Sequence, residues 1–240
     1  MARNLTLTQL LDKYRTEARL SLNPAHNLQV RDSQVGILQR HQERLWNEHN
    51  WPHMRVRKFV PLQAGQRYYD SPSPIPIDRI ENISIKYGGE WIPLTADIGD
   101  CDMSVWDSDA GDRAWPVERW RISEENQIEV WPIPASDGEA DDSREGHIRV
   151  TGIRNLQNLV ADDDRCDIDG DLIVMFAAAE TLAGSGAKDA QLKLKTAERM
   201  QARLIGNWKP LRQYSILQGS RPVMPMRRGP PTVHYRDNET

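Results

Sequence analysis

Apolar residues recur at helical spacing at the start of the chain. Thr6 and Gln9 fit a capping box, in which each side chain satisfies a backbone donor at the beginning of a helix. One face of that helix carries Leu7, Leu10, Leu11, Tyr14 and Ala18. A second helix is predicted to begin with Asp32 or Ser33 as its cap and to end near Asn50, because a proline follows. Its apolar face carries Val35, Leu38, Leu45 and Trp46.

After residue 52 the pattern changes to the alternation that is typical of strands. The alternating apolar positions are Val56, Val60, Leu62, Ile83, Ile85, Tyr87, Ile148 and Val150. Gly88-Gly89 supplies the positive φ angles of a tight hairpin turn, and a second hairpin is predicted over residues 120–131 with its turn at 124–127.

Helical spacing returns in the last third of the chain. Asp169 or Asp171 can cap a helix, and Ser185-Gly186 separates it from another one. The apolar faces of these two helices carry Leu172, Met175, Phe176, Ala179 and Leu182, then Ala190, Leu194, Ala197, Met200 and Leu204.

Beyond residue 209, five prolines forbid regular structure, yet apolar side chains are spread among them. Residues 209–236 contain six basic residues and no acid. We interpret this segment as an arm that docks on a partner protein, because phosphate binding alone would need only charge. Nucleic-acid binding and plain disorder stay open as alternatives. The expected contact residues are Arg212, Tyr214, Ile216, Leu217, Arg221, Met224, Met226, Arg227 and Arg228.

The predicted fold class is therefore α+β. Residues 1–52 and 165–209 are expected to form a four-helix bundle, and residues 53–155 an inserted antiparallel β domain. Residues 210–240 are the extended C-terminal docking arm.

Composition narrows the choice of partners. The net charge of −4 does not favour wrapping a nucleic acid or lying on an anionic membrane. No stretch approaches the roughly 20 apolar residues that a membrane span needs, and we expect synthesis in the cytosol. The charge is uneven, however, because residues 97–112 contain six aspartates and no basic residue.

No metal or cofactor is expected. Residues 162–171 resemble a calcium loop, but Arg165 and Phe176 would occupy two of its ligand positions. Cys101 and Cys166 are predicted to be free thiols. The histidines His41, His49 and His53 are expected to be partly exposed residues near a helix end, since the Trp51-Pro52 pair breaks their spacing.

Catalysis is not expected either. Glu124 and Glu125 lie in a predicted turn, where solvent would surround both carboxylates. No nucleophile elbow, phosphate-binding loop or dinucleotide fingerprint occurs. Six of the eight tryptophans lie between residues 51 and 131, and those on predicted strands (Trp91, Trp120 and Trp131) are expected to pack the sheet rather than to stack on bases or sugars.

Three runs of the sequence carry a family resemblance: residues 39–52, which end the second helix with Trp-Asn-Glu-His-Asn-Trp-Pro, residues 60–69 (Val-Pro-Leu-Gln-Ala-Gly-Gln-Arg-Tyr-Tyr) and residues 80–91. In this order they resemble phage head-to-tail adaptors of the head-completion or tail-tubular A type.

This resemblance implies a structural neck protein of the virion that is assembled in the host cytoplasm. It implies a dodecameric ring between the portal protein and the next tail or nozzle protein, with genome DNA passing through the lumen without specific binding. The helices would face the portal, the β domain would face the tail, and the arm would climb onto the portal. Because acidic surfaces repel DNA phosphates, we expect one of the acidic loops 97–112 and 136–145 to line the lumen. A tail terminator or another neck ring, and a virion carbohydrate-binding or hydrolytic protein that uses the tryptophan-rich domain, stay open as alternatives.

Overall fold

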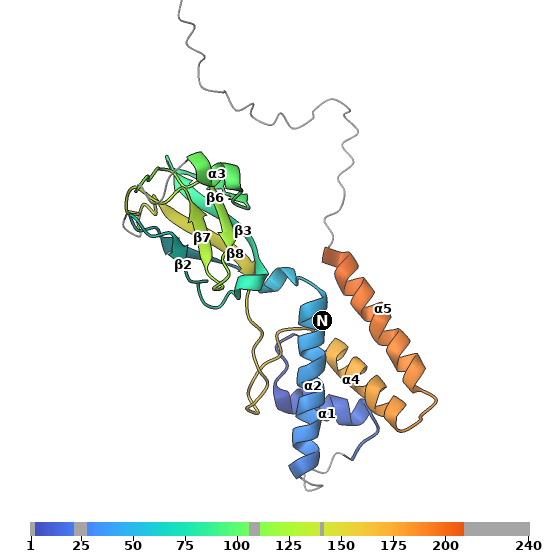
Figure 1. Ribbon diagram of the computed structural model, residues 1–240. Helices are drawn as coiled ribbons and strands as arrows, with labels where there is room; N and C mark the ends of the chain where they lie inside the picture. The colour runs from blue at the N-terminus through green and yellow to red at the C-terminus, as the bar shows by residue number, and fades with distance from the viewer. Residues whose placement is uncertain (1–2, 22–27, 106–110, 140–141, 209–240) are drawn as a thin grey trace, which may run out of the picture.

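The computed structural model describes residues 3–21, 28–105, 111–139 and 142–208, and its fold is α+β as predicted (Figure 1). The long helices are α1 (Leu7–Glu17), α2 (Leu28–Glu48), α4 (Gly170–Gly184) and α5 (Ala190–Trp208). They lie together, and α1, α2 and α5 each contact α4. The strands form a separate body that follows the C-terminal end of α2.

Local capping signals account for the starts of α1 and α4. The capping box of α1 is present, with the backbone N–H of Gln9 donating to Thr6 Oγ1 at 3.4 Å. Asp169 is the N-cap of α4 and accepts from the backbone N–H of Leu172 at 3.3 Å. The prediction for α2 is wrong, because that helix begins at Leu28 and both Asp32 and Ser33 lie inside it. Asp32 lies beyond the first turn of this helix, so residue type alone does not place the boundary.

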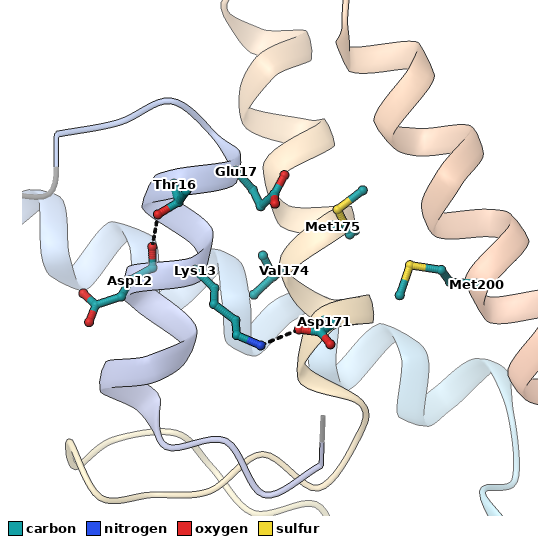
Figure 2. A pocket seen from close by; sticks show the side chains of 8 residues that line it. All are labelled: Asp12, Lys13, Thr16, Glu17, Asp171, Val174, Met175 and Met200. Atoms are coloured by element: carbon teal, nitrogen blue, oxygen red, sulfur yellow. Dashed lines mark hydrogen bonds and ion pairs between the residues drawn. The ribbon is translucent and has the colours of Figure 1, made fainter. Parts of the chain in front are cut away.

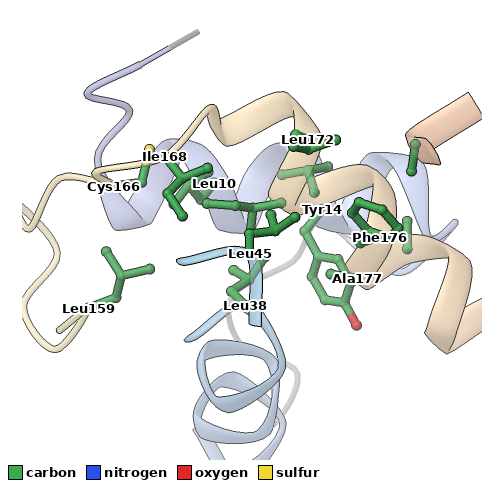
Figure 3. Close-up of a cluster of buried hydrophobic side chains, with 14 of the residues drawn as sticks. Leu10, Tyr14, Leu38, Leu45, Leu159, Cys166, Ile168, Leu172, Phe176 and Ala177 are labelled. Atoms are coloured by element: carbon green, nitrogen blue, oxygen red, sulfur yellow. The ribbon is translucent and has the colours of Figure 1, made fainter. Parts of the chain in front are cut away.

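A single apolar cluster joins the four helices (Figure 3). Helix α4 lies at its centre and is apolar on almost every side, as expected of a helix that neighbours cover all round. The connection between the strands and α4 also contributes to this cluster, through Leu159, Cys166 and Ile168. Its backbone pairs with the start of the chain, since the Cys166 N–H donates to the Leu5 carbonyl at 3.0 Å.

The strands form two four-stranded sheets. The first has the order β1 (Arg55–Pro61), β8 (His147–Ile153), β3 (Ile80–Tyr87) and β4 (Glu90–Pro93); the second has the order β2 (Tyr68–Tyr69), β7 (Ile128–Trp131), β6 (Arg119–Ile122) and β5 (Thr95–Ala96). Both predicted hairpins are present, β3–β4 through Gly88 and Gly89 with φ of 61° and 81°, and β6–β7.

One strand pair departs from the predicted antiparallel arrangement. Strands β5 and β6 run parallel, because the chain between them makes a long crossover that includes the short helix α3 (Asp100–Val105). Helix α3 covers β7, where the Trp131 indole N–H donates to the Asp102 carbonyl at 3.0 Å. A second apolar cluster, which includes Ile83, Ile85, Ile128, Val130, Ile148 and Val150, fills the space between the two sheets.

Arg79 joins the β strands to the end of α2. It lies in the 3-10 turn η2 (Ile77–Arg79), and its guanidinium lies 4.3 Å from the centre of the Trp46 ring. The same group donates to the Trp46 and Asn47 carbonyls, both at 3.3 Å, and to the Asn50 side chain at 3.0 Å. Gly152 of β8 permits this approach, because an added Cβ would come within 2.5 Å of the Arg79 carbonyl oxygen.

Candidate functional site

The residues predicted to dock on a partner all lie outside the described residues. They are Arg212, Tyr214, Ile216, Leu217, Arg221, Met224, Met226, Arg227 and Arg228. Helix α5 ends at Trp208, just before this segment. Candidate sites within residues 3–208 are therefore surfaces that the sequence patterns did not single out.

The first of these surfaces is a groove between α1 and α5, with α4 as its floor (Figure 2). Its volume is about 760 Å³. Asp12, Lys13, Thr16, Glu17, Asp171, Val174, Met175 and Met200 line it. The two methionine side chains are unbranched and polarisable, so this floor can adapt to a side chain of irregular shape.

Ion pairs cross this groove and connect the helices that form it. Lys13 Nζ of α1 lies 2.6 Å from Asp171 Oδ1 of α4, and Lys193 of α5 pairs with Glu17 of α1. Thr16 donates its hydroxyl to the Asp12 carbonyl at 2.9 Å, so this hydroxyl is not hydrogen-bonded to a base that could activate it. The groove is therefore a place where ion pairs connect α1 to α4 and α1 to α5.

His41 lies in the interface between α2 and α4 and is only 6% exposed, so the prediction of a partly exposed histidine is wrong for this residue. Its Nε2 lies 2.7 Å from Glu180 Oε2, and its ring stacks on Phe176. Burial lowers the pKa of His41 below its ordinary value, and the hydrogen bond to Glu180 opposes that shift only in part. The sequence placed this residue on a helix but could not show that α4 covers it.

The acidic run before α4 is satisfied by the protein's own backbone. Asp164 accepts from the backbone N–H groups of Val160 and Ala161 at 2.7 and 2.6 Å, which lower the pKa of its carboxyl. Asp167 accepts from the Gln157 N–H at 2.7 Å and pairs with Arg154. These oxygens thus bind N–H groups of the chain.

Metal-ligand groups do not converge in the parts of the chain that the structure describes. Cys166 is a free, buried thiol whose pKa burial raises, and the side chain of Cys101 lies outside the description. Among the described helices, none combines the length and the apolar character needed to cross a bilayer.

Two of the three strand tryptophans follow the predicted packing. Trp120 and Trp131 are buried, whereas Trp91 is half-buried on the outer face of the first sheet. Glu124 and Glu125 are exposed in the β6–β7 turn, as predicted. Buried indole rings cannot stack on a sugar, so the strand tryptophans offer only Trp91 to a ligand.

Glu129 was missed by the sequence analysis. It is 1% exposed on β7, and Arg67 and Arg121 both pair with it. A charged residue between Ile128 and Val130 on an otherwise apolar strand is the signal that could have revealed it. Since a buried carboxylate requires partners, this fork of two arginines fixes β2, β6 and β7 against one another.

The second surface that the sequence patterns did not single out lies on the outer face of the first sheet. We call it the arginine platform and define it as Arg57, Phe59, Trp91, Arg144 and Arg149. The Phe59 and Trp91 ring centres are 5.5 Å apart. The Arg144 guanidinium lies 4.0 Å from the Phe59 ring centre, and that of Arg149 lies 4.6 Å from the Trp91 ring centre. Stacking of this kind holds a guanidinium flat and leaves its N–H edge free for an acceptor.

The acidic loops are described only in part. In the 97–112 loop, Asp102 pairs with Arg119 at 3.0 Å, and Asp97 and Asp100 are exposed. In the 136–145 loop, Glu145 accepts from the backbone N–H groups of Gly88 and Gly89, which ties this loop to the β3–β4 turn.

The described residues thus form helices packed on a central helix and a separate two-sheet β body. A family model described as "SU10 adaptor protein" matches residues 5–220. Because this match covers most of the chain, the protein belongs to the SU10 adaptor family of phage head-to-tail adaptors. No curated protein matches the sequence. The family makes the protein a virion component that interacts with portal and tail components.

Proposed function

We propose that this chain forms a ring between the portal and the tail of a phage, through which the genome passes. Membership in the adaptor family carries the proposal. In this proposal the ring is a dodecamer that is assembled in the host cytoplasm. Residues 1–52 and 165–209 form a helical bundle on the portal side, and residues 53–155 form a β domain on the tail side. The two separate apolar clusters support this division, because each part has its own core.

The proposed portal contact is the arm, residues 210–240. Its composition supports this role, since six basic side chains and no acid lie between residues 209 and 236, interleaved with apolar ones. Arginine and aromatic side chains dominate the energetics of protein interfaces, and the arm contains both. Because α5 ends at Trp208, the arm can be removed without cutting a described helix or strand.

The proposed lumen surface is acidic. A conduit must let DNA slide, and aspartates repel phosphates. We propose that one of the acidic loops 97–112 and 136–145 contributes to this surface.

A truncation after Lys209 tests the portal contact. We expect a folded chain with unchanged circular dichroism that no longer binds purified portal, as judged by the mass of the mixed complex. A matched full-length variant with Ile216, Leu217 and Met224 changed to serine keeps the charge of the arm and should also lose portal binding.

Undiminished portal binding by the truncated chain would contradict the arm's role. Failure of the intact chain to bind portal would contradict the portal contact itself and favour a tail terminator or another neck ring.

A further inference from the structure

The arginine platform carries positive charge that the chain itself does not neutralise. Arg57, Arg144 and Arg149 form no ion pair with a carboxylate among the residues that the structure describes, whereas Arg55 on the same strand pairs with Glu81 at 2.6 Å. Unpaired guanidinium groups that lie on aromatic rings are typical of interface residues that carry binding energy. The platform is therefore prepared for an acidic partner.

The position of each side chain follows from strand alternation. Phe59 and Arg149 are paired in register on β1 and β8, while their neighbours Val60, Ile148 and Val150 turn into the core between the sheets. The platform therefore lies on the outer face of the first sheet, away from the second sheet.

Exposed acids lie on the opposite side of the β body. Val130 of β7 faces the core, so Trp131 points outward, and its bond to the Asp102 carbonyl places α3 on the outer face of the second sheet. Asp97 and Asp100 are exposed beside it, and the described residues show no direct ion pair of either. The pKa of the Arg121 guanidinium is raised by its hydrogen bond to Glu129 and, to a smaller extent, by Asp97 nearby. The arginines of this second face, Arg67, Arg119 and Arg121, are already paired with Glu129 and Asp102, so the exposed carboxylates of Asp97 and Asp100 are the groups that it offers to another molecule.

We propose that the arginine platform is a lateral docking surface that binds the acidic side of a second copy of this chain, around Asp97 and Asp100. The inference deepens the proposed ring and rests on it. A head-to-tail contact in a ring needs two different, complementary surfaces on each subunit, and the arginine platform and the exposed aspartates beside α3 meet that need. Charge complementarity also fixes the register and suppresses wrong pairings.

Nucleic acid is the competing occupant. Guanidinium groups also bind phosphate, but the chain has a net charge of −4, and a conduit that gripped DNA would hinder its passage. A second copy brings the exposed carboxylates of its Asp97 and Asp100. The observations therefore favour protein over DNA.

Charge reversal in the full-length chain tests the pairing. One variant carries Arg57→Glu and Arg144→Glu, both at exposed positions, and a second carries Asp100→Lys. A third combines all three changes. Lys195→Glu together with Arg199→Glu, both exposed on α5, changes the net charge as much as the first variant does and is the control. Self-association is measured by sedimentation velocity at low salt, and neighbour cross-linking is measured on purified portal.

Each reversal should weaken lateral association by about tenfold or more, the combined variant should recover most of it, and the control should match the unaltered chain. Portal binding through the arm is measured in the same mixtures. Subunits that bind portal and cross-link to neighbours equally well in all variants would overturn the platform's role while leaving the adaptor function intact. An unaltered chain that fails to bind portal would instead overturn the proposed function.

Two further results bear on the occupant. Weakening by both reversals without recovery in the combined variant would overturn the pairing of these two faces. Salt-dependent binding of duplex DNA by the unaltered chain, lost in the Arg57→Glu and Arg144→Glu variant, would assign the platform to nucleic acid and overturn the proposal.

Discussion

Replacing Arg79 with alanine should loosen the connection between the strands and the helices. This guanidinium lies over the Trp46 ring and donates to carbonyl oxygens at the end of α2, which have no partner within the helix. Alanine removes all of these contacts, while the carbonyl groups can be solvated again because the region is half-exposed.

The structure sets the size of the effect. A cation at a helix C-terminus contributes about 0.3–1 kcal/mol, and a half-exposed cation–π contact contributes about 0.5–1 kcal/mol. The hydrogen bonds add about 1 kcal/mol net, since water replaces them in the variant. We expect a loss of about 2–3 kcal/mol, or a fall in Tm of about 5–10 °C for a chain of this size.

Thermal unfolding followed by far-ultraviolet circular dichroism measures this change. The matched variant Arg79→Lys keeps the charge at the helix end but lacks the planar fork, so it should lose only about half as much. An Arg79→Ala variant that unfolds at the unaltered temperature would refute this account of the junction.

Two other predictions concern packing and pH. Gly152→Ala should lower the free energy of unfolding by about 2–3 kcal/mol, because its Cβ would press on the Arg79 backbone. Gly36→Ala on the open side of α2 should instead raise it by about 0.5–1 kcal/mol. Urea unfolding compares the two variants, and equal midpoints would contradict the close approach at Gly152. His41 has a folded-state pKa below its ordinary value of 6.5, so the unfolded chain binds the proton more readily. The stability that neutral His41 contributes is therefore complete above pH 6.5. It is lost as the pH falls toward the folded-state pKa. His41→Phe should therefore show a smaller loss of Tm than the unaltered chain between about pH 7 and pH 5, and identical pH profiles would show that His41 does not titrate in this way.

Several features of the candidate surfaces could not be predicted from the sequence. His41 and Glu180 are far apart in sequence, and nothing in the local pattern of either helix indicates that they meet. The arginine platform combines residues from β1, β4, β8 and the loop before β8, so its members become neighbours only once the strand order is known. Arg149 alone carried a local signal, as a charged residue that alternates with Ile148 and Val150.

The sequence by itself determined the elements whose causes are local. The capping box at Thr6, the Asp169 cap, the Gly88-Gly89 turn and the alternation on β3 depend on residues a few positions apart, and short-range sterics and hydrogen bonds decide them. Only the tertiary structure decided the two-sheet order, the central place of α4 and the grouping of the arginine platform on one outer face of the β body. These features depend on which distant segments bury their apolar sides against one another, and the pattern of neighbouring residues does not determine that pairing.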